Sequence, residues 1–178
     1  DGDAVILVFL SITIASVFSL LLLVIVLIFS SDIAELLGNY ELKNWLFLVP
    51  ASTFLMGIYN ALTFFNIRKQ KFKNVSISLV SRSISLSLSQ AILGLIVLGP
   101  FGLIIGRITS LMTGNMLLYK TLKVHQSDKV ILKNKMTKMA IEYSKFPKFA
   151  VPSIFINSIN LNIINFLISL IYSSSTLG

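Results

Sequence analysis

The stretch that decides the fold runs from Ala4 to Phe29 and reads AVILVFLSITIASVFSLLLLVIVLIF. It contains no charged residue, and Ser and Thr are its only polar side chains. The hydrocarbon core of a bilayer is about 30 Å thick, and about 20 consecutive apolar residues cross it as a helix. The stretch is therefore long enough to span a membrane. Because no basic residue precedes it and it exceeds the apolar region of a signal peptide, we do not expect it to be a cleaved targeting sequence.

The composition extends this interpretation to the whole chain. Of the 178 residues, 55% are hydrophobic and only 12% are charged, cysteine is absent, and the net charge is +8. An ordinary soluble domain has about 25% charged residues. So few charges cannot cover a water-soluble globule of this length, and the lack of cysteine excludes a disulfide scaffold. We therefore expect an integral membrane protein rather than a soluble enzyme domain or a disordered tail.

Four further apolar segments follow the first. Unpaired backbone polar groups are not tolerated in lipid, so these segments are expected to be α-helices. The alternation in Ser83–Ser89 would also suit a barrel strand, but Ser19–Phe29 is apolar on both faces and favours helices. The predicted fold class is all-α, a polytopic transmembrane helix bundle. Its five predicted spans are 4–29, 45–65, 75–98, 102–122 and 149–172.

The basic residues gather in alternate loops. The loop 67–74 contains Arg68 and three lysines, and the loop 123–148 with its flanks contains eight lysines, whereas the loop 30–44 has Lys43 as its only basic residue. Basic loops stay on the cytoplasmic side. Loops 67–74 and 123–148 are therefore predicted to be cytoplasmic. This topology accounts for the positive charge without a nucleic-acid partner.

The loop 123–148 is also amphipathic. Leu132, Met136, Met139 and Tyr143 recur at helical spacing among lysines. This pattern predicts a basic helix on the cytoplasmic leaflet, with anionic membrane lipids as its partners. A recruitment site for a partner protein is the alternative.

The third predicted span is the most polar. Arg82 lies roughly 11 Å inside it, where an arginine in hydrocarbon costs at least about 2.5 kcal/mol unless it faces the bundle interior or a water-filled cavity. The alternative is that its long side chain reaches the cytoplasmic headgroups. Ser85 and Ser89 share its helical face and Gln90 lies beside it, so the four are candidates for a substrate cavity. Arg107 lies closer to the outer turn and is a secondary candidate, with extension to the headgroups favoured.

The fifth predicted span carries several asparagines on its polar faces. A single asparagine commonly joins two helices by a hydrogen bond. Four within nine residues are more than one packing interface requires, so we expect the wall of a polar cavity. The four candidates are Asn157, Asn160, Asn162 and Asn165.

Small residues recur every four positions in the fourth predicted span. Such a stripe lets the backbone of another helix approach closely. A flexible hinge is the alternative, and the two roles are compatible. The four residues are Gly102, Gly106, Ser110 and Gly114.

Catalytic groups are absent from the predicted spans. The chain has one histidine, and no predicted span contains Asp or Glu. No phosphate-binding glycine loop or metal-ligand cluster is found. We therefore expect no enzymatic activity, no cofactor and no bound metal.

Several stretches of the chain resemble bacterial polysaccharide flippases. These stretches are NIRKQKFK at 66–73, Ser81-Arg82, Gln90, LGPFGLIIG at 98–106, and YSKFP at 143–147 with Pro152-Ser153. The family comprises the O-antigen, capsule and exopolysaccharide transporters of the multidrug/oligosaccharidyl-lipid/polysaccharide exporter superfamily.

The resemblance implies a fragment of a larger, two-lobed transporter in the bacterial cytoplasmic (inner) membrane. Such proteins move an undecaprenyl-diphosphate-linked oligosaccharide between leaflets by alternating access. Arg82 matches a position at which members often carry arginine, suited to the diphosphate. Other polysaccharide-assembly membrane proteins are possible partners. The implied domains are 1–122, four helices ending the N-lobe; 123–148, the basic cytoplasmic loop; and 149–178, the first helix of the C-lobe.

Other assignments remain open at this point. A multidrug or cation antiporter should show a buried carboxylate, and a membrane glycosyltransferase or polymerase should show long outward loops with paired carboxylates or arginines. The predicted spans and the outward loop 30–44 have neither. A lipid II flippase of the same superfamily and a structural membrane scaffold are further alternatives.

Overall fold

The computed structural model describes residues 2–36, 42–95 and 100–122, and further on residues 141, 148, 152–153, 156–160 and 163. The chain divides into two compact units, 1–133 and 134–178. Every regular element in the described part of the first unit is an α-helix. The helices are α1 (Gly2–Leu36), α2 (Leu42–Trp45), α3 (Leu48–Arg68), α4 (Phe72–Leu95) and α5 (Pro100–Tyr119).

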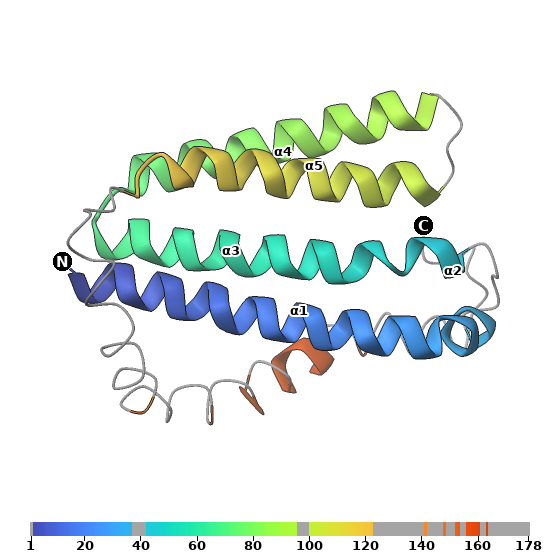
Figure 1. The fold of residues 1–178 in the computed structure, drawn as a ribbon. Helices are drawn as coiled ribbons and strands as arrows, with labels where there is room; N and C mark the ends of the chain where they lie inside the picture. Colours follow the sequence, from blue (N-terminus) through green and yellow to red (C-terminus); the bar gives the residue numbers. More distant parts are fainter. Residues whose placement is uncertain are drawn as a thin grey trace. The chain divides into compact units, whose positions relative to one another are not determined.

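The four long helices of the first unit lie side by side (Figure 1). α1 packs on α3, α3 packs on α5, and α5 makes its largest interface with α4. Apolar side chains from α1, α3 and α5 meet in one cluster, in which Leu62, Leu111 and Leu118 are almost completely inaccessible. A polar contact also joins α1 to α3, because the Ser19 hydroxyl donates to the Pro50 carbonyl at 2.8 Å.

α1 is longer than the predicted span. The apolar run ends at Phe29, but the helix continues to Leu36 and includes Asp32 and Glu35. The apolar run marks the part suited to lipid, whereas the helix ends only where its backbone hydrogen bonds end. The predicted bounds therefore underestimated the length of this helix.

The second predicted span begins three residues late in the structure. The short helix α2 ends at Trp45, and α3 starts at Leu48 rather than at Trp45. Pro50 is the third residue of α3. A proline is tolerated in the first turn because the backbone N–H it lacks would have no intrahelical partner there.

The connection between α3 and α4 is a tight helix cap. Gln70 adopts a left-handed conformation, with φ 55°. The Lys71 N–H donates to the Asn66 carbonyl at 2.9 Å, and the Gln70 N–H donates to the Ile67 carbonyl at 2.9 Å. This pair of bonds is the Schellman motif, which satisfies the last carbonyls of a helix. α3 therefore ends abruptly, and α4 begins at Phe72.

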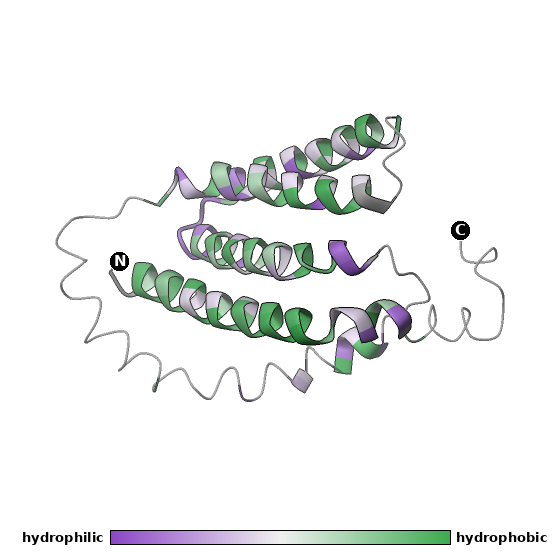
Figure 2. Ribbon diagram, turned by 45° about the vertical axis from the view of Figure 1, so that its right-hand side comes forward, coloured by the Kyte–Doolittle hydropathy of each residue, from purple (hydrophilic) through white to green (hydrophobic). Residues whose placement is uncertain are grey.

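Two stretches are long and apolar enough to cross a membrane, Ala4–Glu35 and Lys43–Arg68, with mean hydropathies of 3.0 and 1.4. Figure 2 shows α1 hydrophobic along most of its length, whereas α4 and α5 carry many hydrophilic residues. These two helices do not meet the same criterion among the described residues. The all-α fold is confirmed for the described residues, and the count of five spans stays a prediction.

Parts of the predicted organisation lie outside the described residues. They include the loop 123–148 apart from Ile141 and Lys148, and most of the predicted span 149–172. Within that span, residues 156–160 are helical. The assignment of 1–122, 123–148 and 149–178 to lobes and loop stays a prediction.

Candidate functional site

The interface between α4 and α5 is built on the small residues of α5. A Cβ atom added to Gly106 would lie 2.6 Å from Gln90 Cγ, and one added to Gly102 would lie 3.0 Å from Leu93 Cβ. Carbon atoms pack best at about 3.5–4.0 Å. A larger side chain at Gly106 would therefore displace the Gln90 side chain, and one at Gly102 would press on Leu93 of α4. The hinge alternative for this stripe stays a prediction.

Hydroxyl groups cross the same interface as hydrogen-bonded pairs. Ser85 Oγ lies 3.1 Å from Thr113 Oγ1, and Thr109 Oγ1 donates to Ser89 Oγ at 2.9 Å. Gln90 directly follows Ser89, and its Nε2 lies 3.4 Å from the Leu103 carbonyl of α5. Three of the predicted cavity residues of α4 therefore have partners on α5. We call these contacts the hydroxyl ladder.

Arg82 lies in the middle of α4 and is enclosed by three helices. Its guanidinium carbon is 4.0 Å from the centroid of the Tyr59 ring on α3. A Cβ atom at Gly114 of α5 would lie 2.6 Å from Arg82 Cδ. The Ser110 hydroxyl donates to the Arg82 carbonyl at 2.9 Å, and the buried Ser78 hydroxyl lies 3.4 Å from both the Tyr59 hydroxyl and the Gly114 carbonyl. The absence of a side chain at Gly114 thus makes the space that Arg82 occupies against Tyr59.

The guanidinium group of Arg82 has no hydrogen-bond acceptor among the described residues, and its Nε atom is buried without a partner. Arg82 lines a pocket of about 180 Å³ between α4 and α5, and Arg107 lines the same pocket. Arg107 likewise makes no hydrogen bond or ion pair within the described part of the chain. We call this the arginine pocket; its other lining residues are Leu79, Ser83, Leu86 and Ser110.

The charge of the arginine pocket is uncompensated within the three helices around it. α3, α4 and α5 contain neither Asp nor Glu. A charged side chain deep in a membrane costs at least about 2.5 kcal/mol, and such residues mark substrate or ion pathways by default. Arg82 is half-buried and Arg107 is exposed, and as two arginines without an acceptor beside one pocket they are candidates for binding an anion.

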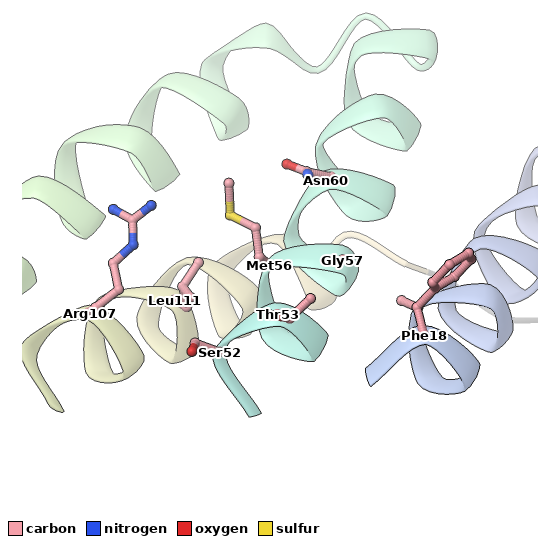
Figure 3. A pocket seen from close by; sticks show the side chains of 9 residues that line it. Phe18, Ser52, Thr53, Met56, Gly57, Asn60, Arg107 and Leu111 are labelled. Carbon is pink, nitrogen blue, oxygen red and sulfur yellow. The ribbon is translucent and has the colours of Figure 1, made fainter. Parts of the chain in front are cut away.

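A second, larger pocket opens on the other side of Arg107. Its volume is about 490 Å³, and it lies between α1, α3 and α5. Figure 3 shows Arg107 and Leu111 on α5 at one side, Phe18 on α1 at the other, and the α3 residues between them. We call it the Asn60 pocket; α3 contributes Ser52, Thr53, Met56, Gly57 and Asn60, and α1 also contributes Ala15.

The structure separates residues that the sequence placed together. Ser85 and Ser89 line a third, shallow pocket of about 430 Å³ with Thr113, and Arg82 is not part of it. Arg107 is exposed and lines the same pocket as Arg82, and its expected extension to the headgroups stays a prediction. The cavity roles of Ser85, Ser89 and Gln90 stay predictions.

The asparagine face of the fifth predicted span is only partly described. Asn157 and Asn160 are helical and exposed, in the second unit. Asn162 and Asn165 lie outside the described residues. Their expected cavity role stays a prediction.

Sequence reasoning missed the α3 residues near the two arginines, which are Tyr59 beside Arg82 and Asn60 in the second pocket that Arg107 lines. Tyr59 and Asn60 belong to α3, which is separated from α4 by a turn and from α5 by a whole helix. Helical periodicity shows which residues share a face of one helix, but not which side chains of another helix oppose them. The one available signal was Asn60 itself, a polar side chain in the middle of an apolar span.

These features define an α-helical bundle that has two stretches suited to crossing a membrane and pockets lined by cationic and hydroxyl-bearing side chains. A family model described as polysaccharide biosynthesis protein matches residues 8–178. The chain therefore belongs to the polysaccharide biosynthesis protein family, which indicates a role in polysaccharide biosynthesis or export. Comparisons with curated proteins and with solved structures gave no match.

Proposed function

We propose that the chain is part of a flippase of the bacterial cytoplasmic membrane. It moves an undecaprenyl-diphosphate-linked oligosaccharide from the inner to the outer leaflet by alternating access. The observation that carries this proposal is the arginine pocket, in which Arg82 and Arg107 offer two guanidinium groups without a hydrogen-bond acceptor between α4 and α5. The family, with its role in polysaccharide biosynthesis, supports the choice of a glycan-bearing substrate.

The chemistry of the pocket suits a diphosphate. A guanidinium group can donate two parallel hydrogen bonds to a phosphate, and it stays charged even when removed from water. The Tyr59 ring, 4.0 Å from the guanidinium carbon of Arg82, restrains the group before the substrate arrives. Transport requires binding and release without any bond being broken, so the pocket needs no catalytic group or cofactor.

The depths of the basic residues suit a stepwise passage. With the cytoplasmic ends of α3 and α4 joined at the basic loop 67–74, Arg82 lies about 15 Å along α4 from Phe72 at 1.5 Å per residue. Arg107 lies about 10 Å along α5 from its outer end. A diphosphate headgroup entering from the cytoplasm would meet Arg82 first and Arg107 next. Anionic lipids at the cytoplasmic loops and other polysaccharide-assembly membrane proteins are the proposed neighbours.

The proposal is tested by removing each charge in the intact transporter. Arg82→Gln and Arg107→Gln should each lower the rate of lipid-linked oligosaccharide translocation in proteoliposomes by about 10- to 100-fold, because a hydrogen bond to a charged group contributes about 1.5–3 kcal/mol. Arg68→Gln is the matched control, since Arg68 is exposed at the end of α3 and lies outside the arginine pocket. Membrane insertion is measured for all three variants.

Unchanged translocation by both pocket variants would exclude the arginine pocket as the substrate site. Equal losses in all three variants would attribute the effect to general positive charge. Ion-driven export of a hydrophobic cation in the same proteoliposomes, with no movement of the lipid-linked oligosaccharide, would favour the antiporter alternative.

A further inference from the structure

The Asn60 pocket contains polar groups that helix packing does not use. Asn60 is exposed to the pocket, and its amide makes no hydrogen bond within the described residues. Two other asparagines behave differently. Asn66 Nδ2 donates to the Leu62 carbonyl at 2.8 Å, and Asn115 Nδ2 donates to the Leu55 carbonyl at 3.0 Å. The polar groups of Asn60 are thus available to something outside the described helices.

Asn60 lies so deep along α3 that an amide without a hydrogen-bond partner would be costly there. It lies about 18 Å along α3 from Leu48, near the middle of a bilayer about 30 Å thick. An amide without a hydrogen-bond partner in an apolar surrounding costs several kcal/mol. A polar ligand or water beside Asn60 would remove this cost.

The neighbouring hydroxyl groups can still accept hydrogen bonds. The Thr53 hydroxyl donates to the Val49 carbonyl at 2.9 Å, and the Ser52 hydroxyl donates to the Leu48 carbonyl at 2.7 Å. Each hydroxyl oxygen retains lone pairs, because a hydroxyl group donates once and accepts twice. The pocket therefore offers acceptors on two hydroxyls and both donors and an acceptor on one amide.

Apolar and cationic groups complete the lining. Phe18 and Met56 supply apolar surface, and Arg107 supplies a positive charge that it shares with the arginine pocket. Apolar walls with a few convergent polar groups are typical of small-molecule sites, and the volume of about 490 Å³ falls within their usual range. A sugar ring has both hydroxyl groups and apolar C–H faces, so this lining is complementary to one.

We propose that the Asn60 pocket binds the saccharide nearest the diphosphate. The proposal rests on the proposed function, and Arg107 connects the two sites because it lines both pockets. The diphosphate then occupies the arginine pocket, and the first sugar contacts Asn60 and Thr53. The Asn60 pocket adds affinity for a glycosylated lipid over a bare one.

The test compares two probes on the purified full-length transporter in detergent. The probes are undecaprenyl diphosphate and undecaprenyl diphosphate carrying one N-acetylglucosamine. Asn60→Leu and Thr53→Val should each weaken binding of the glycosylated probe by about two- to tenfold, the effect of one hydrogen bond, and leave the bare probe unchanged. Thr13→Val is the matched control, because Thr13 is equally exposed, donates to the Phe9 carbonyl at 2.9 Å and lies outside the pocket.

The outcomes separate this proposal from the proposed function. If Arg82→Gln weakens both probes but Asn60→Leu and Thr53→Val leave the preference for the glycosylated probe intact, the saccharide proposal alone is wrong. If Arg82→Gln weakens neither probe, the proposed function fails. A cysteine replacing Asn60 should react with a water-soluble thiol reagent and be protected by the glycosylated probe. A cysteine that is unreactive without any lipid would mean that another helix fills the pocket, which overturns the proposal.

Discussion

Gly114 is the position where one added methyl group should disturb the arginine pocket most directly. A Cβ atom there would lie 2.6 Å from Arg82 Cδ, 2.7 Å from Arg82 Cγ and 2.8 Å from Tyr59 Cε2. All three contacts are about 1 Å shorter than the favourable carbon–carbon separation. Gly114→Ala must therefore displace the Arg82 side chain from the Tyr59 ring or separate α4 from α5.

Displacing Arg82 and separating the two helices have similar costs in free energy. Loss of the contact between the guanidinium group and the aromatic ring costs about 1–2 kcal/mol for a desolvated pair. Overpacking between helices costs about 1–3 kcal/mol. The gain in helix propensity from glycine to alanine is up to about 1 kcal/mol and opposes either cost. The expected net loss in the free energy of unfolding is about 1–2 kcal/mol.

Gly94→Ala provides the matched control. A Cβ atom at Gly94 meets nothing within 4 Å, and the residue lies one position before the end of α4. This variant should be as stable as the parent or slightly more stable. Unfolding of the intact protein in mixed micelles, titrated with a denaturing detergent and followed by circular dichroism, measures both free energies.

A second variant identifies the clashing partner. Arg82→Ala removes Cγ and Cδ, so the combination with Gly114→Ala should be less destabilised than the sum of the two single variants. Equal stability of Gly114→Ala and Gly94→Ala would refute the packing argument. Strict additivity in the double variant would show that Arg82 is not the group displaced.

Three further predictions concern the framework around the pockets. Gly57→Ala places a Cβ atom 2.5 Å from Ala15 Cβ, so it should lower stability by about 1–3 kcal/mol in thermal melts. Ala15→Gly in the same chain should restore the stability, and a neutral Gly57→Ala would contradict the close contact of α1 and α3. Gln70→Gly should raise the free energy of unfolding by about 0.5–1 kcal/mol, because the left-handed conformation penalises a side chain. Gln70→Ala should change this free energy little, and equal effects of the two variants would be inconsistent with the observed φ. A double-mutant cycle of Ser85→Ala and Thr113→Val should give a coupling of about 0.6 kcal/mol in detergent unfolding, and zero coupling would remove this pair from the hydroxyl ladder.

The helices of the first unit were predictable from the sequence because their apolar runs are long. Their ends were less predictable, since different physics fixes them. α1 passes Phe29 because Ser30–Leu36 is compatible with a helix although it is polar in part. α3 stops at Arg68 because the chain can turn through Gln70, and a glutamine gives little sign of a left-handed conformation. Hydropathy finds where a helix suits lipid, whereas backbone hydrogen bonds decide where it ends.

The unusual residues of the candidate site could be predicted from the sequence, but their arrangement could not. The sequence identified Arg82 and Arg107 as unusual, because a charge inside an apolar span stands out from its neighbours. It could not show that they line one pocket, since that depends on how α4 is rotated against α5. It also grouped Ser85 with Arg82, although the structure pairs Ser85 with Thr113.

The polar residues of α4 divide into two kinds once their partners are known. Serine and threonine hydroxyls can satisfy one another across two helices, and in the hydroxyl ladder they do so. A guanidinium group has five donors and no acceptor, so hydroxyls and a single aromatic ring leave most of its capacity unused. Arg82 lies over the Tyr59 ring and lines the arginine pocket. The ladder hydroxyls thus have partners within the described helices, whereas the unsatisfied donors of Arg82 and Arg107 are the groups that a diphosphate would satisfy.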